Sequence, residues 1–368
     1  MRQSVAAVAD RRGHVLGAVR LPLGISYHGM PRADLHDRIW ALLQAVLAEA
    51  GKPSDALDES VVCIGLTGVT FPHDAAVGLP AELIDSQINA AGLVCTGDAE
   101  IVFASHAQAA HGGAVLCHMG STAYVLADNQ KVRFGGWGPA FGDEGSGYWM
   151  GREALRAIGY KIQEGNHDTV LHEEVRRWLD SPDGSVAEWA EGSLIWKQYA
   201  AGHQAHGHDP GEALFVFAHH VRLRSVSAWR RIASGVTIPL MRAWDRHDEE
   251  ATRIVVGAAR NLAWQLRSAY AIAGVDGDWG PIVLYGGVLT HHPAFRDLLA
   301  AEIAKTLSGD LHFLSPRDET ALRPALGALL LALGNSDPSH LRLPDPEVID
   351  RVAAAAVDPR FKDALRND

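Results

Sequence analysis

Short apolar runs alternate along the chain with longer segments whose apolar residues recur at helical spacing. The short runs are bounded by turn residues and predict strands. They lie at 4–10, 14–20, 61–66, 101–103, 114–116, 124–127, 131–134, 281–285 and 311–314. Helical spacing is found at 31–46, 81–91, most of 146–274, 293–303, 324–333 and 348–357. Strand pairs followed by helices predict an α/β fold with a mixed sheet and helices on its faces.

The length of the chain indicates how many domains this pattern forms. A chain of 368 residues is longer than one hydrophobic core usually supports, so we expect two lobes. We assign residues 1–110 to an N-terminal lobe and 111–334 to a C-terminal lobe. Within the second lobe we expect a helical insertion at about 160–245, and we expect residues 335–368 to form a peripheral tail.

Composition and charge exclude several classes of function. The net charge is −11 and the sequence pI is about 5.9, which is unlike a nucleic-acid-binding protein. No apolar run reaches the roughly 18–20 residues of a membrane helix, and the first residues lack the apolar core of a signal peptide. Cys63, Cys95 and Cys117 lack paired spacing, which argues against disulfides and a zinc site. We therefore expect a cytoplasmic protein with free thiols and no metal held by cysteine or histidine.

The segment 135–147 carries the candidate chemistry. Six of its thirteen residues are glycine, a composition that permits positive φ and a close approach of the backbone to a ligand. Trp137 offers a flat apolar face to a sugar ring, and Asp143 and Glu144 can accept hydrogen bonds from sugar hydroxyls. Ser146 is placed to cap the helix that follows. On composition alone, an ordinary glycine-rich turn with a core tryptophan explains the segment equally well.

The same segment resembles a known family. GGWGPAFGDEGSGYWMGREAL is similar to a motif of the N-acetylglucosamine kinases and the BadF/BadG/BcrA/BcrD ATPases, which belong to the actin-like ATPase superfamily. Shorter stretches resemble other family turns; they are AAVADRRGHVLG at 6–17, GLTG at 65–68, GSTAY at 120–124 and GGV at 286–288. The similarity covers roughly residues 4–334 and is weakest between 160 and 235.

This resemblance implies a two-lobed actin-like ATPase fold, of the ribonuclease H-like type, that uses ATP and Mg²⁺ and phosphorylates a small sugar. It also suggests a homodimer, with neither nucleic acid nor membrane as a partner. The residues that match the family's sugar site are Gly136, Trp137, Gly138 and Asp143. Those that match its ATP-binding turns are Gly120, Ser121, Gly286 and Gly287.

Three departures from the family lie on the phosphate side. The family begins with a central strand that ends in an Asp-Gly-Gly-Gly-Thr loop, and the sequence from Met1 has no counterpart. Its absence predicts two neighbouring strands with unpaired edges. The family's catalytic Asp lies in an Asn-Asp-Ala context after a strand, a place that we assign to Ser105-His106-Ala107, so His106 becomes the candidate base. The Gly-Thr pair of the second phosphate loop is replaced by His118-Met119.

Two functions remain open from the sequence. The first is an ATP-dependent kinase for N-acetylglucosamine or a related amino sugar. The alternative is a degenerate member that binds a sugar or nucleotide and has lost phosphoryl transfer. An activator of a radical enzyme, with an iron–sulfur cluster, is disfavoured by the three scattered cysteines. The arginines at 222, 224, 230 and 231 predict a salt-bridged helix face.

Overall fold

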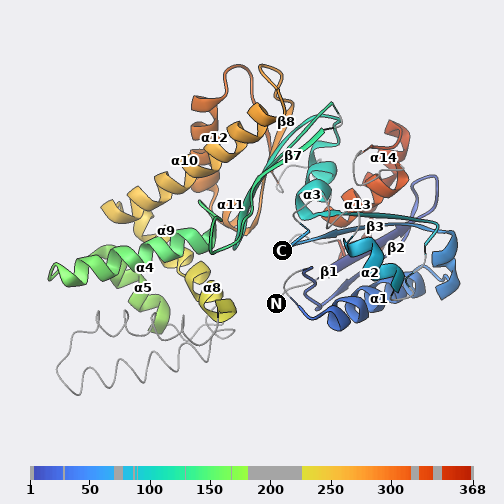
Figure 1. Ribbon diagram of the computed structural model, residues 1–368, viewed down its shortest axis with the longest axis horizontal. Helices are drawn as coiled ribbons and strands as arrows, with labels where there is room; N and C mark the ends of the chain where they lie inside the picture. Colours follow the sequence, from blue (N-terminus) through green and yellow to red (C-terminus); the bar gives the residue numbers. More distant parts are fainter. Residues whose placement is uncertain are drawn as a thin grey trace.

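The computed structural model describes residues 4–27, 30–69, 78–85, 88, 90–128, 130–166, 168–180, 226–315, 323–334 and 342–365. Two lobes lie side by side in Figure 1, and each contains strands with helices packed on them. Residues up to about 107 and those after 323 build one lobe. The intervening residues build the other, and residues 181–225 of the expected insertion lie outside the described residues.

The N-terminal lobe contains two separate pairs of strands. β1 (Ser4–Ala9) and β2 (Val15–Leu21) form the predicted antiparallel hairpin, whose turn contains Gly13 at φ 89°. β3 (Val61–Leu66) pairs in parallel with β4 (Gly92–Gly97). The helical elements of this lobe are α1 (Arg32–Glu49), the 3-10 helix η1 (Ser54–Glu59) and α2 (Leu79–Asp85). Apolar side chains of α1, η1, α2, β3 and β4 form a common core.

β1 and β3 each have one open edge in the part of the chain that the structure describes. Among the described residues β1 pairs only with β2 and β3 only with β4, so no hydrogen bonds join these two sheets there. All residues of both strands line one cavity. The unpaired neighbouring edges that the resemblance predicted are therefore present.

The expected strand at 101–103 is wrong. These residues lie inside α3 (Asp98–Ala107), and the strand of this region is β4, which ends at Gly97. An apolar run of three residues does not distinguish a strand from one turn of a buried helix, and tertiary packing decides. α3 is buried on several sides because it packs against both lobes.

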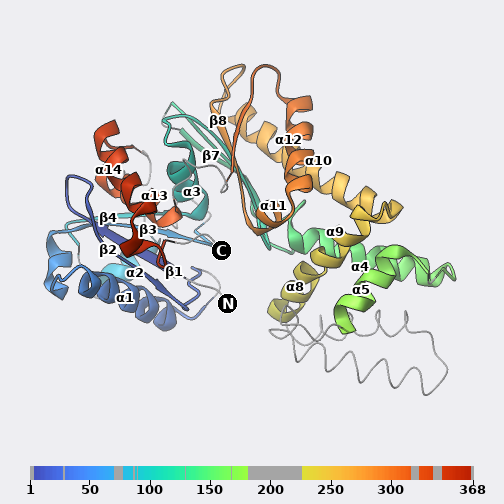
Figure 2. The same cartoon turned by 180° about the vertical axis from the view of Figure 1, so that it is seen from behind.

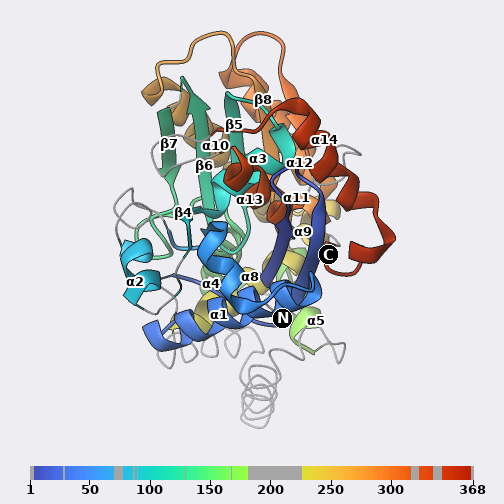
Figure 3. The same ribbon diagram turned by 90° about the vertical axis from the view of Figure 1, so that its right-hand side faces the viewer.

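The C-terminal lobe is built on a five-stranded sheet with the order β7-β6-β5-β8-β9 (Figure 3). Its strands are β5 (Gly112–Cys117), β6 (Ser121–Ala127), β7 (Gln130–Gly135), β8 (Pro281–Tyr285) and β9 (His312–Leu314). β6 and β7 form the second predicted hairpin, and β8 joins β5 in parallel. Every residue of β5 and β6 is buried, because helices cover both faces of these strands.

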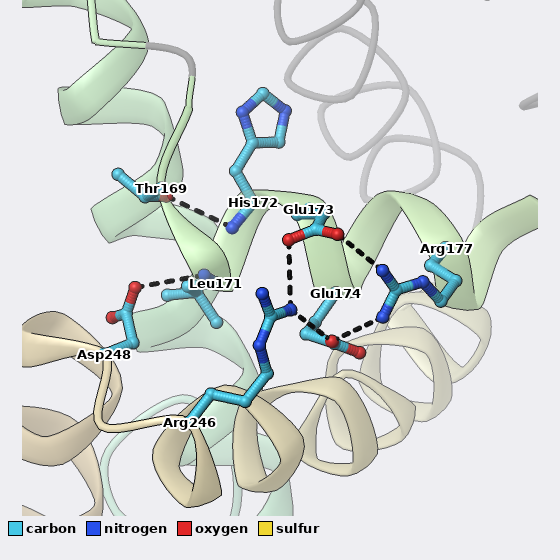
Figure 4. A network of polar contacts seen from close by, with 8 residues as sticks. All are labelled: Thr169, Leu171, His172, Glu173, Glu174, Arg177, Arg246 and Asp248. Atoms are coloured by element: carbon cyan, nitrogen blue, oxygen red, sulfur yellow. Dashed lines mark hydrogen bonds and ion pairs between the residues drawn. The ribbon is translucent and has the colours of Figure 1, made fainter.

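Helices complete this lobe. They are α4 (Gly147–Gln163), α5 (Val170–Asp180), α8 (Val226–Gly235), α9 (Thr237–Asp245), α10 (Glu249–Ile272), α11 (Gly287–His291) and α12 (Pro293–Thr306). Arg246, just after α9, contacts Glu173 and Glu174 of α5 at 3.0 and 2.7 Å (Figure 4). The carboxylate of Asp248 accepts the backbone N–H of Leu171 at 3.1 Å in the same network. These contacts fix α5 against the junction of α9 and α10.

The chain then returns to the first lobe. α13 (Pro324–Leu333) packs against α3 (Figure 2), and α14 (Pro346–Val357) packs on the β1–β2 hairpin, followed by a 3-10 turn at Pro359–Phe361. Val352 and Phe361 are buried there, so residues 346–361 contribute to the core of the lobe.

The three cysteines are free, as predicted. Cys95 and Cys117 are buried and Cys63 is half-buried. Burial raises the pKa of Cys95 to about 12, which keeps its thiol protonated.

Candidate functional site

One large cavity lies between the two lobes and continues between β1 and β3. Its volume is about 2080 Å³. Eight of the nine predicted site residues line it, from loops that are far apart in the sequence. They are Gly120, Ser121, Gly136, Trp137, Gly138, Asp143, Gly286 and Gly287. His106 is the exception, because it does not line the cavity.

The predicted sugar-binding segment is an extended turn that presents Trp137 to the cavity. Gly135, Gly136 and Gly138 have φ values of 78°, 72° and 78°, which residues with a Cβ rarely adopt. The side chain of Trp137 packs closely over Gly142, where an added Cβ would lie 3.0 Å from the Trp137 Cβ. Trp137 nevertheless remains 67% exposed, so its indole face is open to a ligand.

Asp143 is the buried carboxylate of this segment. It has a φ of 62°, and its Oδ1 accepts the N–H of Ser121 at 3.4 Å. Arg230 of α8 donates from Nη2 to Oδ2 at 2.8 Å. Burial raises the pKa of Asp143, and Arg230 and the Ser121 N–H act in the opposite direction. A Cβ on Gly120 would lie 2.9 Å from Oδ1, so a glycine is needed for this approach.

Hydrogen bonds from β6 and α10 hold the rest of the segment in place. The Ser121 hydroxyl donates to the Glu144 carbonyl at 2.8 Å, and Gln265 of α10 donates to the same oxygen at 3.0 Å. Ser146 caps α4 as predicted, because its Oγ accepts the N–H of Trp149 at 3.1 Å. These bonds hold the predicted sugar-binding segment, residues 135–147, on the C-terminal lobe.

The turn after β8 provides a close backbone approach. Gly286 has a φ of 126°, and an added Cβ would lie 2.2 Å from the carbonyl oxygen of Cys117. The N–H of Gly287 donates to Nδ1 of His118 at 3.1 Å, so this imidazole joins the turn to the loop after β5. Desolvation lowers the pKa of His118, although the nearby Asp98 opposes this effect. A neutral imidazole that accepts at Nδ1 carries its proton on Nε2.

The structure places the expected base, His106, away from the cavity. His106 lies in the last turn of α3, is 3% exposed, and has its Nδ1 3.0 Å from the carbonyl oxygen of Val102. Its ring packs edge-on against Tyr285. Because 101–103 is helical, Ser105-His106-Ala107 does not follow a strand.

Asp98 occupies the place that follows a strand. It is the first residue of α3, directly after β4, and it lines the cavity. Its Oδ2 accepts from the Thr67 hydroxyl at 3.2 Å and its Oδ1 from Arg133 at 3.4 Å. The sequence Gly97-Asp98-Ala99 carries the Asp-Ala half of the family's Asn-Asp-Ala motif. The sequence therefore contained this Asp-Ala pair, but the strand predicted at 101–103 directed attention to the residues after 103 instead.

Neither a structural metal centre nor a membrane span is found in the described part of the chain. No group of three or more His, Cys, Asp or Glu side chains there could hold a metal ion. Across the same residues, no helix combines the length and apolar character needed to cross a bilayer.

Comparisons with known proteins agree with this architecture. Residues 3–332 match the model of the BadF/BadG/BcrA/BcrD ATPase family. An N-acetylmuramic acid/N-acetylglucosamine kinase of Clostridium acetobutylicum is 29% identical over 39% of this chain and 47% of its own length. An N-acetyl-D-glucosamine kinase of Dictyostelium discoideum is 25% identical over 74% of this chain and 75% of its own. The match thus spans about half of the first relative and three quarters of the second.

Solved structures with the same fold are more distant in sequence. A putative N-acetylglucosamine kinase from Chromobacterium violaceum superposes with a TM-score of 0.57 at 20% identity, covering 90% of this chain and 98% of that one. A second protein with that description, from Porphyromonas gingivalis, gives a TM-score of 0.51 at 17% identity, covering 89% and 97%. At these identities the likeness supports the two-lobed fold.

Proposed function

The chain belongs to the BadF/BadG/BcrA/BcrD ATPase family, and we propose that it is an ATP-dependent sugar kinase for N-acetylglucosamine or a related amino sugar. One observation carries the proposal. The sugar-binding segment, the Gly286-Gly287 turn and the carboxylate of Asp98 all line a single cavity between the lobes. Both relatives named above are kinases of this sugar class.

The proposed sugar contacts come from the C-terminal lobe. The exposed indole of Trp137 would stack on the C–H face of a pyranose, and Asp143 would accept hydrogen bonds from ring hydroxyls. Gly136 and Gly138 would leave room for the ring beside the backbone. Hydroxyl recognition by a buried carboxylate is strong because the acceptor is ionised and shielded from water.

We assign the general base to Asp98, in place of His106. In the reaction, the sugar hydroxyl oxygen attacks the γ-phosphorus of ATP, the bond to the β,γ-bridging oxygen breaks, and ADP leaves. The hydroxyl proton passes to the Asp98 carboxylate. Asp98 is suited to this step because it lines the cavity and hydrogen bonds from Thr67 and Arg133 fix its orientation.

The residues around the nucleotide side fit ATP as follows. Gly120 and Ser121 would face its phosphates, and Gly286 and Gly287 would lie against the adenosine. Mg²⁺ is commonly held by one or two carboxylates together with substrate phosphates, and Asp98 is a carboxylate available on this side. When bound, the ion would neutralise developing phosphate charge.

A second candidate function is a sugar or nucleotide binder without turnover. Two observations favour it. His118-Met119 replaces the Gly-Thr pair of the second phosphate loop. The edges of β1 and β3 remain open within the described residues, where the family has its first phosphate-binding strand.

Turnover and binding measured on one protein distinguish the two functions. We expect the chain to consume ATP in the presence of N-acetylglucosamine, and Asp98→Asn to lower kcat by about 10²–10⁴-fold while sugar binding by calorimetry persists. Glu250→Gln, at a half-buried residue of α10 that pairs with Arg253, is the control and should leave kcat unchanged. Sugar binding without turnover in the wild type would favour the second function. Absence of both would rule out the kinase and the sugar binder together.

A further inference from the structure

Arg133 connects the two lobes through all three nitrogens of its side chain. It lies on β7 and is only 17% exposed. Nε donates to the Thr122 hydroxyl of its own sheet at 3.2 Å. Nη1 and Nη2 reach the other lobe, where they donate to the Val69 carbonyl at 2.9 Å and to Asp98 Oδ1 at 3.4 Å.

The fit around this guanidinium is close. A Cβ on Gly97 would lie 2.7 Å from Nη1, so the turn between β4 and α3 needs a glycine beside Arg133. The Thr67 hydroxyl donates to Oδ2 of Asp98 at 3.2 Å, so both oxygens of the carboxylate accept a hydrogen bond. A lysine ammonium has the donors but not the planar fork that reaches three acceptors in fixed directions.

Arg133 also lies two residues before the start of the sugar-binding segment. β7 ends at Gly135, and Gly136, Trp137 and Gly138 follow directly. β7 therefore leads directly into the sugar-binding segment and also carries Arg133, the side chain that contacts Asp98. Arg133 therefore adds a direct side-chain link between this segment and the Asp98 carboxylate to the packing of α3 against both lobes.

We propose that Arg133 is a positioning residue that holds Asp98 in place relative to the sugar-binding segment. It thereby sets the distance between the Asp98 carboxylate on one lobe and the sugar hydroxyl bound on the other. The catalytic part of this inference rests on the proposed function. A general base works within about 2.6–3.2 Å of the proton that it accepts. A displacement of about 1 Å can cost around 10²-fold in rate, so loss of the connection should act on kcat.

A role in holding the lobes together, without effect on Asp98, predicts a different result. It would lower stability or weaken the affinity for both ligands, with kcat per folded molecule unchanged. The split between kcat and substrate affinity therefore separates the two roles.

The test compares Arg133→Met, Arg133→Lys and Thr122→Val with the wild type. Arg133→Met should lower kcat by about 10²-fold, while the dissociation constant for N-acetylglucosamine by calorimetry stays within about threefold. Arg133→Lys should recover part of the loss because it keeps the charge. Thr122→Val leaves the arginine in place and removes its Nε acceptor, together with the hydrogen bond that the hydroxyl donates to the Phe134 carbonyl at 3.2 Å. It should lower kcat by a few fold even if Arg133→Met does not fold. Arg253→Met, an exposed arginine on α10, is the matched control.

The proposal is overturned if Arg133→Met and Thr122→Val both keep the kcat of the wild type. It is also overturned if Arg133→Met loses affinity for N-acetylglucosamine by the same factor as it loses kcat. A wild type without turnover overturns the proposed function instead, and amide exchange then tests the connection. Arg133→Met must raise exchange at 66–69 and 97–99 and leave β5 unchanged. Unchanged exchange in both segments overturns the inference independently of activity.

Discussion

At the residue scale, the charge of Asp143 reflects two opposing influences. Burial raises the pKa of its carboxyl, whereas Arg230 and the Ser121 N–H favour the ionised form. Arg230→Met removes the nearby positive charge, so we expect the pKa of Asp143 to rise further. The ionised carboxylate is the better acceptor for sugar hydroxyls, so binding should then be lost at a higher pH as the solution is acidified.

Calorimetric titration with N-acetylglucosamine at pH 5 and pH 7.5 checks this expectation. Arg230→Met should lose more affinity at pH 5 than at pH 7.5, relative to the wild type. Arg230→Lys keeps the charge and should show a smaller difference between the two pH values. Equal losses at both pH values would show that Arg230 acts by packing and not through the protonation of Asp143.

Residues of the site differ in how far the sequence could reveal them. Trp137, Asp143 and the glycine turns lie within short motifs, and all of them line the cavity. Arg133 and Arg230 meet their carboxylate partners across 35 and 87 positions of the chain. No local pattern encodes such contacts, because they depend on which elements the fold brings together. The basic run containing Arg230 predicted a salt-bridged helix face, but not a partner in the sugar-binding segment.

At the element scale, Asp248 stabilises two helices at once. Its Oδ1 accepts the N–H of Ala251 at 2.9 Å and caps α10, and its Oδ2 accepts the N–H of Leu171 at the start of α5. Asp248→Ala should lower the free energy of unfolding by about 1–2 kcal/mol, since both donors lose their acceptor. Thermal unfolding should show a Tm decrease of about 2–4 °C per kcal/mol. The exposed Asp276→Ala is the control, and an equal Tm for both variants would contradict the capping role.

Elements with two independent sequence signals were predicted well. The hairpins of β1–β2 and β6–β7 combine apolar runs with a turn, and β8 and α13 were predicted with their observed bounds. The prediction for the segment 92–107 failed because its apolar runs, at 93–95 and 101–104, are both short, and five residues with the sequence TGDAE separate them. Burial of α3 between the lobes makes it apolar on most sides, which removes the helical periodicity. The misplaced strand then placed the expected base at His106 and not at Asp98, the residue that follows β4.

At the scale of the whole molecule, the two lobes are stabilised unequally. The C-terminal lobe has one large core around β5, β6 and α10, with both central strands fully buried. Within the described residues, the N-terminal lobe has two pairs of strands that are not hydrogen-bonded to each other, and a cavity lies along them. Unpaired strand edges and missing apolar contacts both lower stability. The N-terminal lobe should therefore unfold first.

The distribution of tryptophan allows this order to be measured. Among the eight tryptophans of the described residues, only Trp40 lies in the N-terminal lobe, so their fluorescence reports mainly on the C-terminal lobe. Far-UV circular dichroism reports on the helices and strands of both lobes. In a urea titration we expect ellipticity to fall in a first transition that fluorescence does not follow, and both signals to change together in a second. Trp40→Phe should leave the fluorescence curve unchanged. Coincident transitions by both probes would mean that α3, which packs against both lobes, couples them into one cooperative unit.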